Sequence, residues 1–168
     1  MLSNFDIEEI ANHFNIQIVI VMKDELKNIH PTSYQNYIIN LQSSDKGNGT
    51  HWMALKIKNK ECVYFDSYGY LPPEEIISFC KRIKGSHLAY NTKQIQDLSA
   101  ITCRFFSIAF LIFLHIDSSQ NLYKKSSNFS DLFSLDTKVN NRKLQRLFRL
   151  LPNEFSLPVL KKDRKSVV

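Results

Sequence analysis

The chain has 168 residues, 43% of them hydrophobic, which is enough for one compact domain but too short for two. Its longest apolar run, Phe105 to Ile116, covers about a dozen residues, whereas a membrane span needs about 20, so we expect a buried helix there. Twenty-two Lys and Arg against 16 Asp and Glu give a formal net charge of +6, which favours acidic partners.

The N-terminal segment predicts a helix followed by two strands. Ser3 and Asp6 have the spacing of a capping box, and residues 1–14 continue as a polar-faced helix, which does not have the pattern of a signal peptide. The β-branched run 16–22 predicts a buried strand, and residues 37–41 predict a second one.

A β-hairpin is the strongest local signal in the sequence. Residues 51–57 and 61–66 are predicted as strands joined by the short polar turn 58–60. In an antiparallel pair the start of one strand lies beside the end of the other, so this pairing brings His51 close to Asp66.

The second half of the chain predicts mainly helices. Pro72 and Pro73 precede a helix over residues 74–84, and a short strand follows at 86–90. An apolar helix opens at Cys103, residues 128–137 are predicted as a loop, and residues 140–151 as a basic amphipathic helix. We therefore expect an α+β domain over residues 1–160, with a basic tail at 161–168.

Three cysteines, an odd number without metal-ligand spacing, indicate a reducing compartment and at least one free thiol. Cys62 lies in an alternating strand and Cys80 on the apolar face of a helix, which is typical of small buried side chains. Cys103 is different, because a polar stretch leads into it and a helix N-terminus favours the thiolate form. From position alone, Cys103 is either a nucleophile or a third buried thiol.

Three blocks of the sequence resemble one family. Residues 49–54 (Gly-Thr-His-Trp-Met-Ala), residues 64–69 (Tyr-Phe-Asp-Ser-Tyr-Gly) and the seven-residue step from Gln96 to Cys103 are similar to the adenovirus maturation protease. The wider resemblance is to proteases of virophages, Polinton-type elements and giant viruses, and more distantly to SUMO-specific proteases. It implies a papain-like or adenain-like fold, with a central mixed sheet flanked by helices and the nucleophile at the start of a buried helix.

The resemblance also implies the roles of the site residues. Cys103 would attack the scissile carbonyl, His51 would act as general base and then acid, and Asp66 would orient His51. The Gln96 side chain and the Cys103 backbone N–H would bind the oxyanion. No metal or cofactor is implied, although DNA or a peptide remains a candidate activator.

Two residues beside these positions are expected to be structural. Trp52 is expected to pack next to His51, and Arg104 stands where the family usually has glycine. A long side chain at that position would crowd a substrate channel or disturb the helix start, which motivates the alternative of an inactive homologue that acts as a binding protein. A deconjugase that removes a ubiquitin-like modifier is the alternative enzyme.

The resemblance further implies viral precursor polypeptides, capsid proteins among them, as substrates, cleaved next to small residues such as glycine. We expect a monomer without membrane contact that acts in the virion and inside the host cell, in the cytoplasm or nucleus, and is not secreted. The basic residues after Asn140 are either a solvated helix face with a tail or a surface for non-specific DNA binding.

Overall fold

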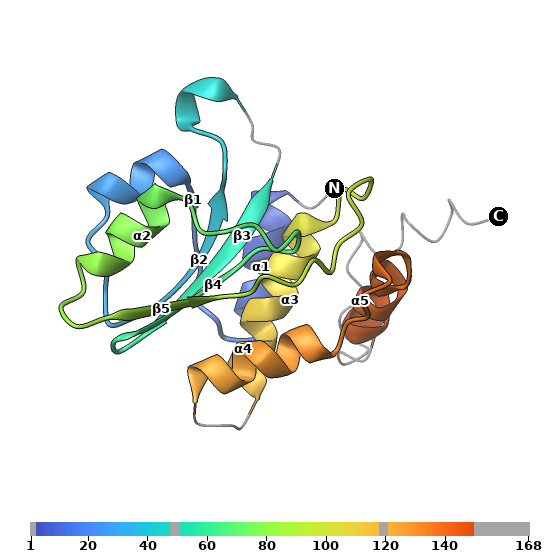
Figure 1. Ribbon diagram of the computed structural model, residues 1–168. Coiled ribbons are helices and arrows are strands. Elements are labelled where there is room, and N and C mark those ends of the chain that lie inside the picture. The colour runs from blue at the N-terminus through green and yellow to red at the C-terminus, as the bar shows by residue number, and fades with distance from the viewer. Residues whose placement is uncertain (1–2, 48–50, 118–120, 150–168) are drawn as a thin grey trace.

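A five-stranded mixed sheet lies at the centre of the computed structural model, which describes residues 3–47, 51–117 and 121–149 (Figure 1). The strands lie side by side in chain order. They are β1 (Val19–Met22), β2 (Tyr34–Asn40), β3 (Trp52–Lys58), β4 (Glu61–Phe65) and β5 (His87–Tyr90). β2, β3 and β4 pair antiparallel, whereas the two outer strands pair parallel with their neighbours. The predicted α+β class with a central mixed sheet is therefore confirmed.

Helices cover both faces of this sheet (Figure 1). They are α1 (Asn4–His13), α2 (Glu74–Lys81), α3 (Cys103–Ile116), α4 (Leu122–Asp131) and α5 (Asn140–Arg149), with short 3₁₀ helices at Lys23–Asn28, Ser44–Lys46 and Thr137–Val139. α2 and the first 3₁₀ helix pack on one face, and the remaining α-helices contribute to the core on the other. Alternate residues of β3 and β4 point to opposite faces, so each face has its own apolar core.

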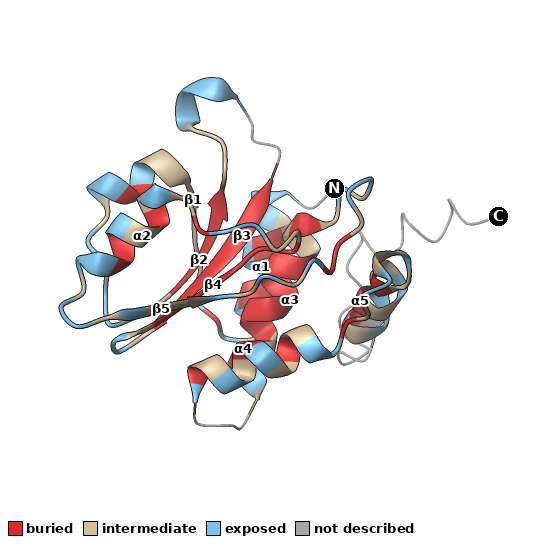
Figure 2. Ribbon diagram, in the orientation of Figure 1, coloured by how far each residue is buried: buried red, intermediate tan, exposed pale blue. Residues whose placement is uncertain are grey.

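α3 is the most deeply buried helix in Figure 2, where most of it is drawn as buried. Its Phe110 ring stacks on Phe65 of β4, with ring centroids 4.5 Å apart. Phe129 of α4 meets both rings edge-on, at 5.4 Å and 5.3 Å. These contacts fix α3, which begins at Cys103, relative to the hairpin.

Most predicted elements occur, with two corrections. The capping box at Ser3 and the antiparallel hairpin are confirmed. The first strand is shorter than predicted and forms a half-buried edge, because the chain turns back after α1 at Asn15, which has a φ of 53°. The predicted loop 128–137 is wrong in its first part, since α4 continues to Asp131 and buries Phe129.

The C-terminal predictions are only partly covered by the described residues. α5 begins at Asn140 as predicted and buries Leu144 and Phe148, while Arg142 and Arg146 face outward. The predicted domain limit at residue 160 and the basic tail 161–168 lie outside the described residues. Within the described part of the chain, each helix is too short or too polar to cross a membrane.

Candidate active site

The hairpin brings His51 and Asp66 into direct contact. Ala54 of β3 pairs with Phe65 of β4, so the residue just before β3 lies close to the residue just after β4. The His51 Nε2 and Asp66 Oδ2 atoms are 2.8 Å apart, and both side chains are buried. The carboxylate therefore holds one ring nitrogen of the imidazole, as the antiparallel pairing predicts.

Asp66 is itself held by several hydrogen bonds. Its backbone N–H donates to Asn91 Oδ1 at 2.9 Å, and its carbonyl oxygen accepts from Asn91 Nδ2 at 2.7 Å. The carboxylate oxygen Oδ1 accepts from the backbone N–H of Tyr68 at 2.7 Å, which leaves Oδ2 for His51 and for the Tyr64 hydroxyl at 3.2 Å. Burial, followed by the negative charge of Asp66, raises the pKa of Tyr64, so its hydroxyl stays protonated and donates.

The carboxylate leaves the second ring nitrogen of His51 unbound. Nδ1 is buried and has no hydrogen-bond partner within the described residues. Burial alone would lower the pKa of His51, but the interactions with Asp66 and with the Cys103 side chain outweigh it and raise the pKa to about 9. An imidazolium between a carboxylate and a thiol favours the thiolate, which is the nucleophilic form of cysteine.

Cys103 is the first residue of α3, as the sequence predicts, and the residue is 6% exposed. Thr102 precedes it without a side-chain cap on the helix, since its hydroxyl is hydrogen-bonded to Asn141 of α5 at 3.1 Å. The first-turn N–H groups of a helix lack intrahelical partners and carry a positive partial charge, which favours a negative sulfur. Cys62 and Cys80 are buried away from this site in the opposite core and are not disulfide-bonded.

Gln96 is fully buried, and its carboxamide is held on both sides. The oxygen Oε1 accepts from Ser67 Oγ at 2.7 Å. The nitrogen Nε2 donates to the Tyr68 hydroxyl at 3.1 Å and to the Ala100 carbonyl oxygen at 2.5 Å. Gln96 thus lies in the loop that leads to Cys103, and both of its amide hydrogens have acceptors. Its predicted role in the oxyanion hole stays a prediction.

Trp52 and Arg104 lie next to each other. The Trp52 side chain is buried, and the Arg104 guanidinium lies over its ring, 4.1 Å from the ring centroid. Burial lowers the pKa of Arg104, while the negative groups of Cys103 and Asp6 act in the opposite direction. Since α3 begins at Cys103 with Arg104 as its second residue, Arg104 does not disturb the helix start.

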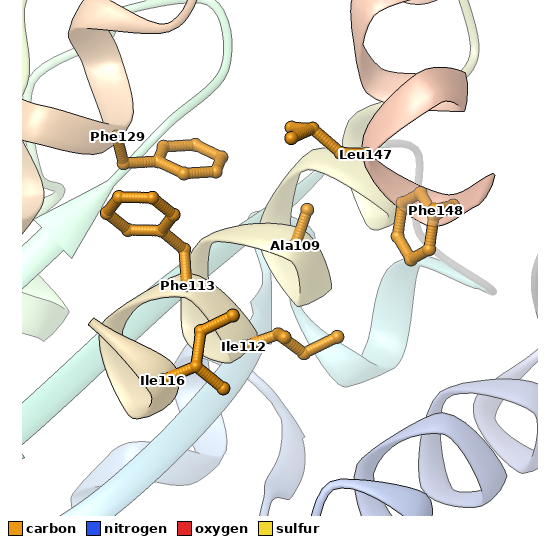
Figure 3. Close-up of a pocket in the computed structure, with 7 residues that line it drawn as sticks. All are labelled: Ala109, Ile112, Phe113, Ile116, Phe129, Leu147 and Phe148. Carbon is orange, nitrogen blue, oxygen red and sulfur yellow. The ribbon is translucent and has the colours of Figure 1, made fainter. Parts of the chain in front are cut away.

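A separate apolar hollow of about 210 Å³ lies between α3, α4 and α5 (Figure 3). Seven apolar residues line it, namely Ala109, Ile112, Phe113, Ile116, Phe129, Leu147 and Phe148. None of them can transfer a proton or act as a nucleophile, so the hollow offers no chemistry of its own. The described residues also contain no cluster of His, Cys, Asp and Glu that could hold a metal ion.

Four residues of the site were not identified from the sequence. Tyr64, Ser67 and Tyr68 lie inside the block that resembles the protease family, and their position within two residues of Asp66 was the available signal. Asn91 had no signal, because it reaches Asp66 from a loop 25 residues further along the chain.

Comparison with known proteins shows the fold. The sequence matches no protein-family model and no curated protein. The crystal structure of the ASFV pS273R protease matches with a TM-score of 0.59 at 16% identity, and the match covers 86% of this chain and 64% of that protease. A second structure of the same protease gives a TM-score of 0.58 at 16% identity, covering 86% and 65%. A structure of AvrA gives a TM-score of 0.45 at 15% identity, and the match covers 86% of this chain and 54% of AvrA.

The chain therefore has the fold of a cysteine protease and spans just under two thirds of the length of the ASFV protease. The more specific resemblance to the adenovirus enzyme rests on the sequence blocks alone.

Proposed function

We propose that this chain is a cysteine endopeptidase, with Cys103 as nucleophile, His51 as general base and acid, and Asp66 as the group that orients His51. The observation that carries the proposal is how the two ring nitrogens of the buried His51 imidazole are bound. One of its nitrogens is bound to a carboxylate at 2.8 Å, and the other is buried without a hydrogen-bond partner among the described residues. Cys103, at the start of α3, is one of the groups that raise the pKa of the ring.

In the proposed reaction, His51 takes the proton of Cys103, and the sulfur forms a bond to the scissile carbonyl carbon. The carbonyl oxygen becomes an oxyanion, which the Gln96 carboxamide and the Cys103 backbone N–H stabilise. The C–N bond then breaks, and His51 gives its proton to the leaving amine. Water attacks the remaining thioester with His51 again as base, which releases the acid product and restores the thiol.

For the substrates we propose viral precursor polypeptides cleaved beside small residues. The support is the sequence resemblance at residues 49–54, 64–69 and 96–103, together with a fold shared with the ASFV protease.

The first test is the reaction of the folded chain with iodoacetamide near neutral pH, with mass spectrometry to locate the label. We expect Cys103 to react at least about tenfold faster than it does in a His51→Ala variant, because only a thiolate attacks. Cys62 and Cys80 serve as internal controls, and His87→Ala, which removes an exposed histidine on β5, is the matched variant.

Equal labelling of Cys103 in the wild type and in His51→Ala would refute an activated nucleophile and leave a binding protein. If the nucleophile is active, incubation with a capsid precursor and with a ubiquitin-like fusion separates the two candidate substrates. Cleavage of the fusion alone, after its C-terminal Gly-Gly, would identify a deconjugase.

A further inference from the structure

One residue, Tyr68, contacts three members of the proposed machinery: His51 and Gln96 through its side chain and Asp66 through its backbone. Its ring stacks on the imidazole of His51, with centroids 4.6 Å apart and planes inclined by 25°. Its hydroxyl accepts a hydrogen bond from Gln96 Nε2 at 3.1 Å and donates to the Ala100 carbonyl oxygen at 3.2 Å. Its backbone N–H donates to Asp66.

These hydrogen bonds decide which way the Gln96 carboxamide points. The Ala100 carbonyl oxygen can only accept, so it must face the nitrogen of the carboxamide. The Ser67 hydroxyl then donates to the carboxamide oxygen on the other side. Because an amide nitrogen has only two hydrogens, an oxyanion can be bound only by exchange with one of the two present acceptors.

Of the two acceptors of Gln96 Nε2, the Tyr68 hydroxyl is the one that can stay bound when an oxyanion binds. It stays bound to the Ala100 carbonyl through its own hydrogen, and this keeps the loop before Cys103 in register with Gln96. If the substrate oxyanion replaces the Ala100 carbonyl as acceptor, the bond from Gln96 to the Tyr68 hydroxyl still fixes the direction of the second hydrogen.

We propose that Tyr68 is a positioning residue of the protease site: its ring holds the His51 imidazole, and its hydroxyl holds the Gln96 carboxamide toward the oxyanion. This inference rests on the proposed function. It means that one side chain aligns the base and the oxyanion donor together, and that its ring and its hydroxyl have separable effects.

Two reagents separate the two effects on the full-length chain. Iodoacetamide alkylates Cys103 by forming a C–S bond as iodide leaves, without an oxyanion. p-Nitrophenyl acetate acetylates Cys103 through a tetrahedral oxyanion that collapses to a thioester and p-nitrophenolate. The variants are Tyr68→Phe, Tyr68→Leu and Gln96→Ala, with Tyr90→Phe as a matched control at an exposed tyrosine of β5. Thermal unfolding confirms that each variant is folded.

For Tyr68→Phe we expect acetylation to slow by about tenfold while alkylation stays within about twofold, because the ring remains and only the support of an oxyanion donor is lost. Gln96→Ala should slow acetylation at least as much, and the double variant should add little to it. Tyr68→Leu, which also removes the stacked ring, should slow both reactions.

The outcome that overturns the inference is a Tyr68→Phe variant whose two rates both match the wild type, or whose two rates fall equally. Either result, with wild-type Cys103 still faster than in His51→Ala, leaves the proposed function standing. If the wild type is no faster than His51→Ala with either reagent, the proposed function fails and this inference fails with it.

Discussion

The contact between His51 and Asp66 makes a quantitative prediction about pH and stability. In Asp66→Asn the shape of the side chain is kept, but the negative charge on the buried imidazole is lost. The pKa of His51 is raised from 6.5 to about 9 in the folded protein, although burial opposes this. A net rise of that size corresponds to about 3 kcal/mol, and the interactions with Asp66 and Cys103 together supply it against the opposing effect of burial.

The direction of the pH dependence follows from the linkage between protonation of His51 and folding. A folded-state pKa above the unfolded value stabilises the protein fully below the unfolded value, and the effect disappears as pH rises through the folded value. The wild type should therefore exceed Asp66→Asn in stability by on the order of 1–3 kcal/mol near pH 6, and the His51 part of this difference should vanish by about pH 10.

Urea unfolding at a series of pH values measures the stability difference, and NMR titration of the His51 ring protons measures the pKa of His51. The exposed Asp131→Asn variant at the end of α4 controls for the general effect of one lost charge. A stability difference that is the same near pH 6 and near pH 10 would refute the reasoning, because it would mean that His51 does not gain its proton affinity from Asp66.

Two further substitutions test other parts of the fold. Gly69 has a φ of 74°, and an added Cβ would lie 2.7 Å from a backbone oxygen. Gly69→Ala should cost about 2–4 kcal/mol in urea unfolding, whereas Gly85→Ala, with φ 73° and no such contact, should cost about 1 kcal/mol. Lys56 is buried and donates to Asn36 and Tyr34, and burial lowers its pKa to about 8. Lys56→Met should therefore stabilise the protein near pH 7, with a gain that shrinks as pH rises from 8 toward 10.5, measured by the same unfolding series.

The parts of the site that could be predicted are those that depend on neighbouring elements. His51 and Asp66 meet because two strands joined by a two-residue turn, residues 59–60, have essentially one antiparallel register. Cys103 lies at a helix start because polar residues give way there to an apolar run, and composition alone reveals such a change.

The parts that could not be predicted depend on contacts between distant segments. Gln96 is fixed by Ser67 from 29 residues away, and Asp66 by Asn91 from 25 residues away, and neither pair has a local pattern. The helix α4 was not predicted, because its Ser- and Asn-rich sequence has low helix propensity. Burial of Phe129 against the stacked rings of Phe65 and Phe110 supplies the stability that propensity does not.

Arg104 is the residue that motivated the alternative of an inactive homologue, and its contacts argue against an obstructing role. Its guanidinium is engaged with the Trp52 ring at 4.1 Å, and the charge of Asp6 in α1 favours its charged form. A side chain that packs on a buried tryptophan contributes to the packing around it. Replacing it with the glycine that the resemblance leads one to expect should therefore remove a contact without opening a channel.

We expect Arg104→Gly to lower the free energy of unfolding by about 1–3 kcal/mol, from the lost cation–π contact and from glycine in a helix. The rates of Cys103 with iodoacetamide and p-nitrophenyl acetate should not increase. Arg104→Lys, which keeps the charge, and Arg104→Met, which keeps the unbranched stem, separate the electrostatic part of the loss from the packing part. A gain of tenfold or more in acetylation for both Arg104→Gly and Arg104→Met would show that the arginine blocks the nucleophile. An active enzyme would then need a partner that moves Arg104 off Trp52.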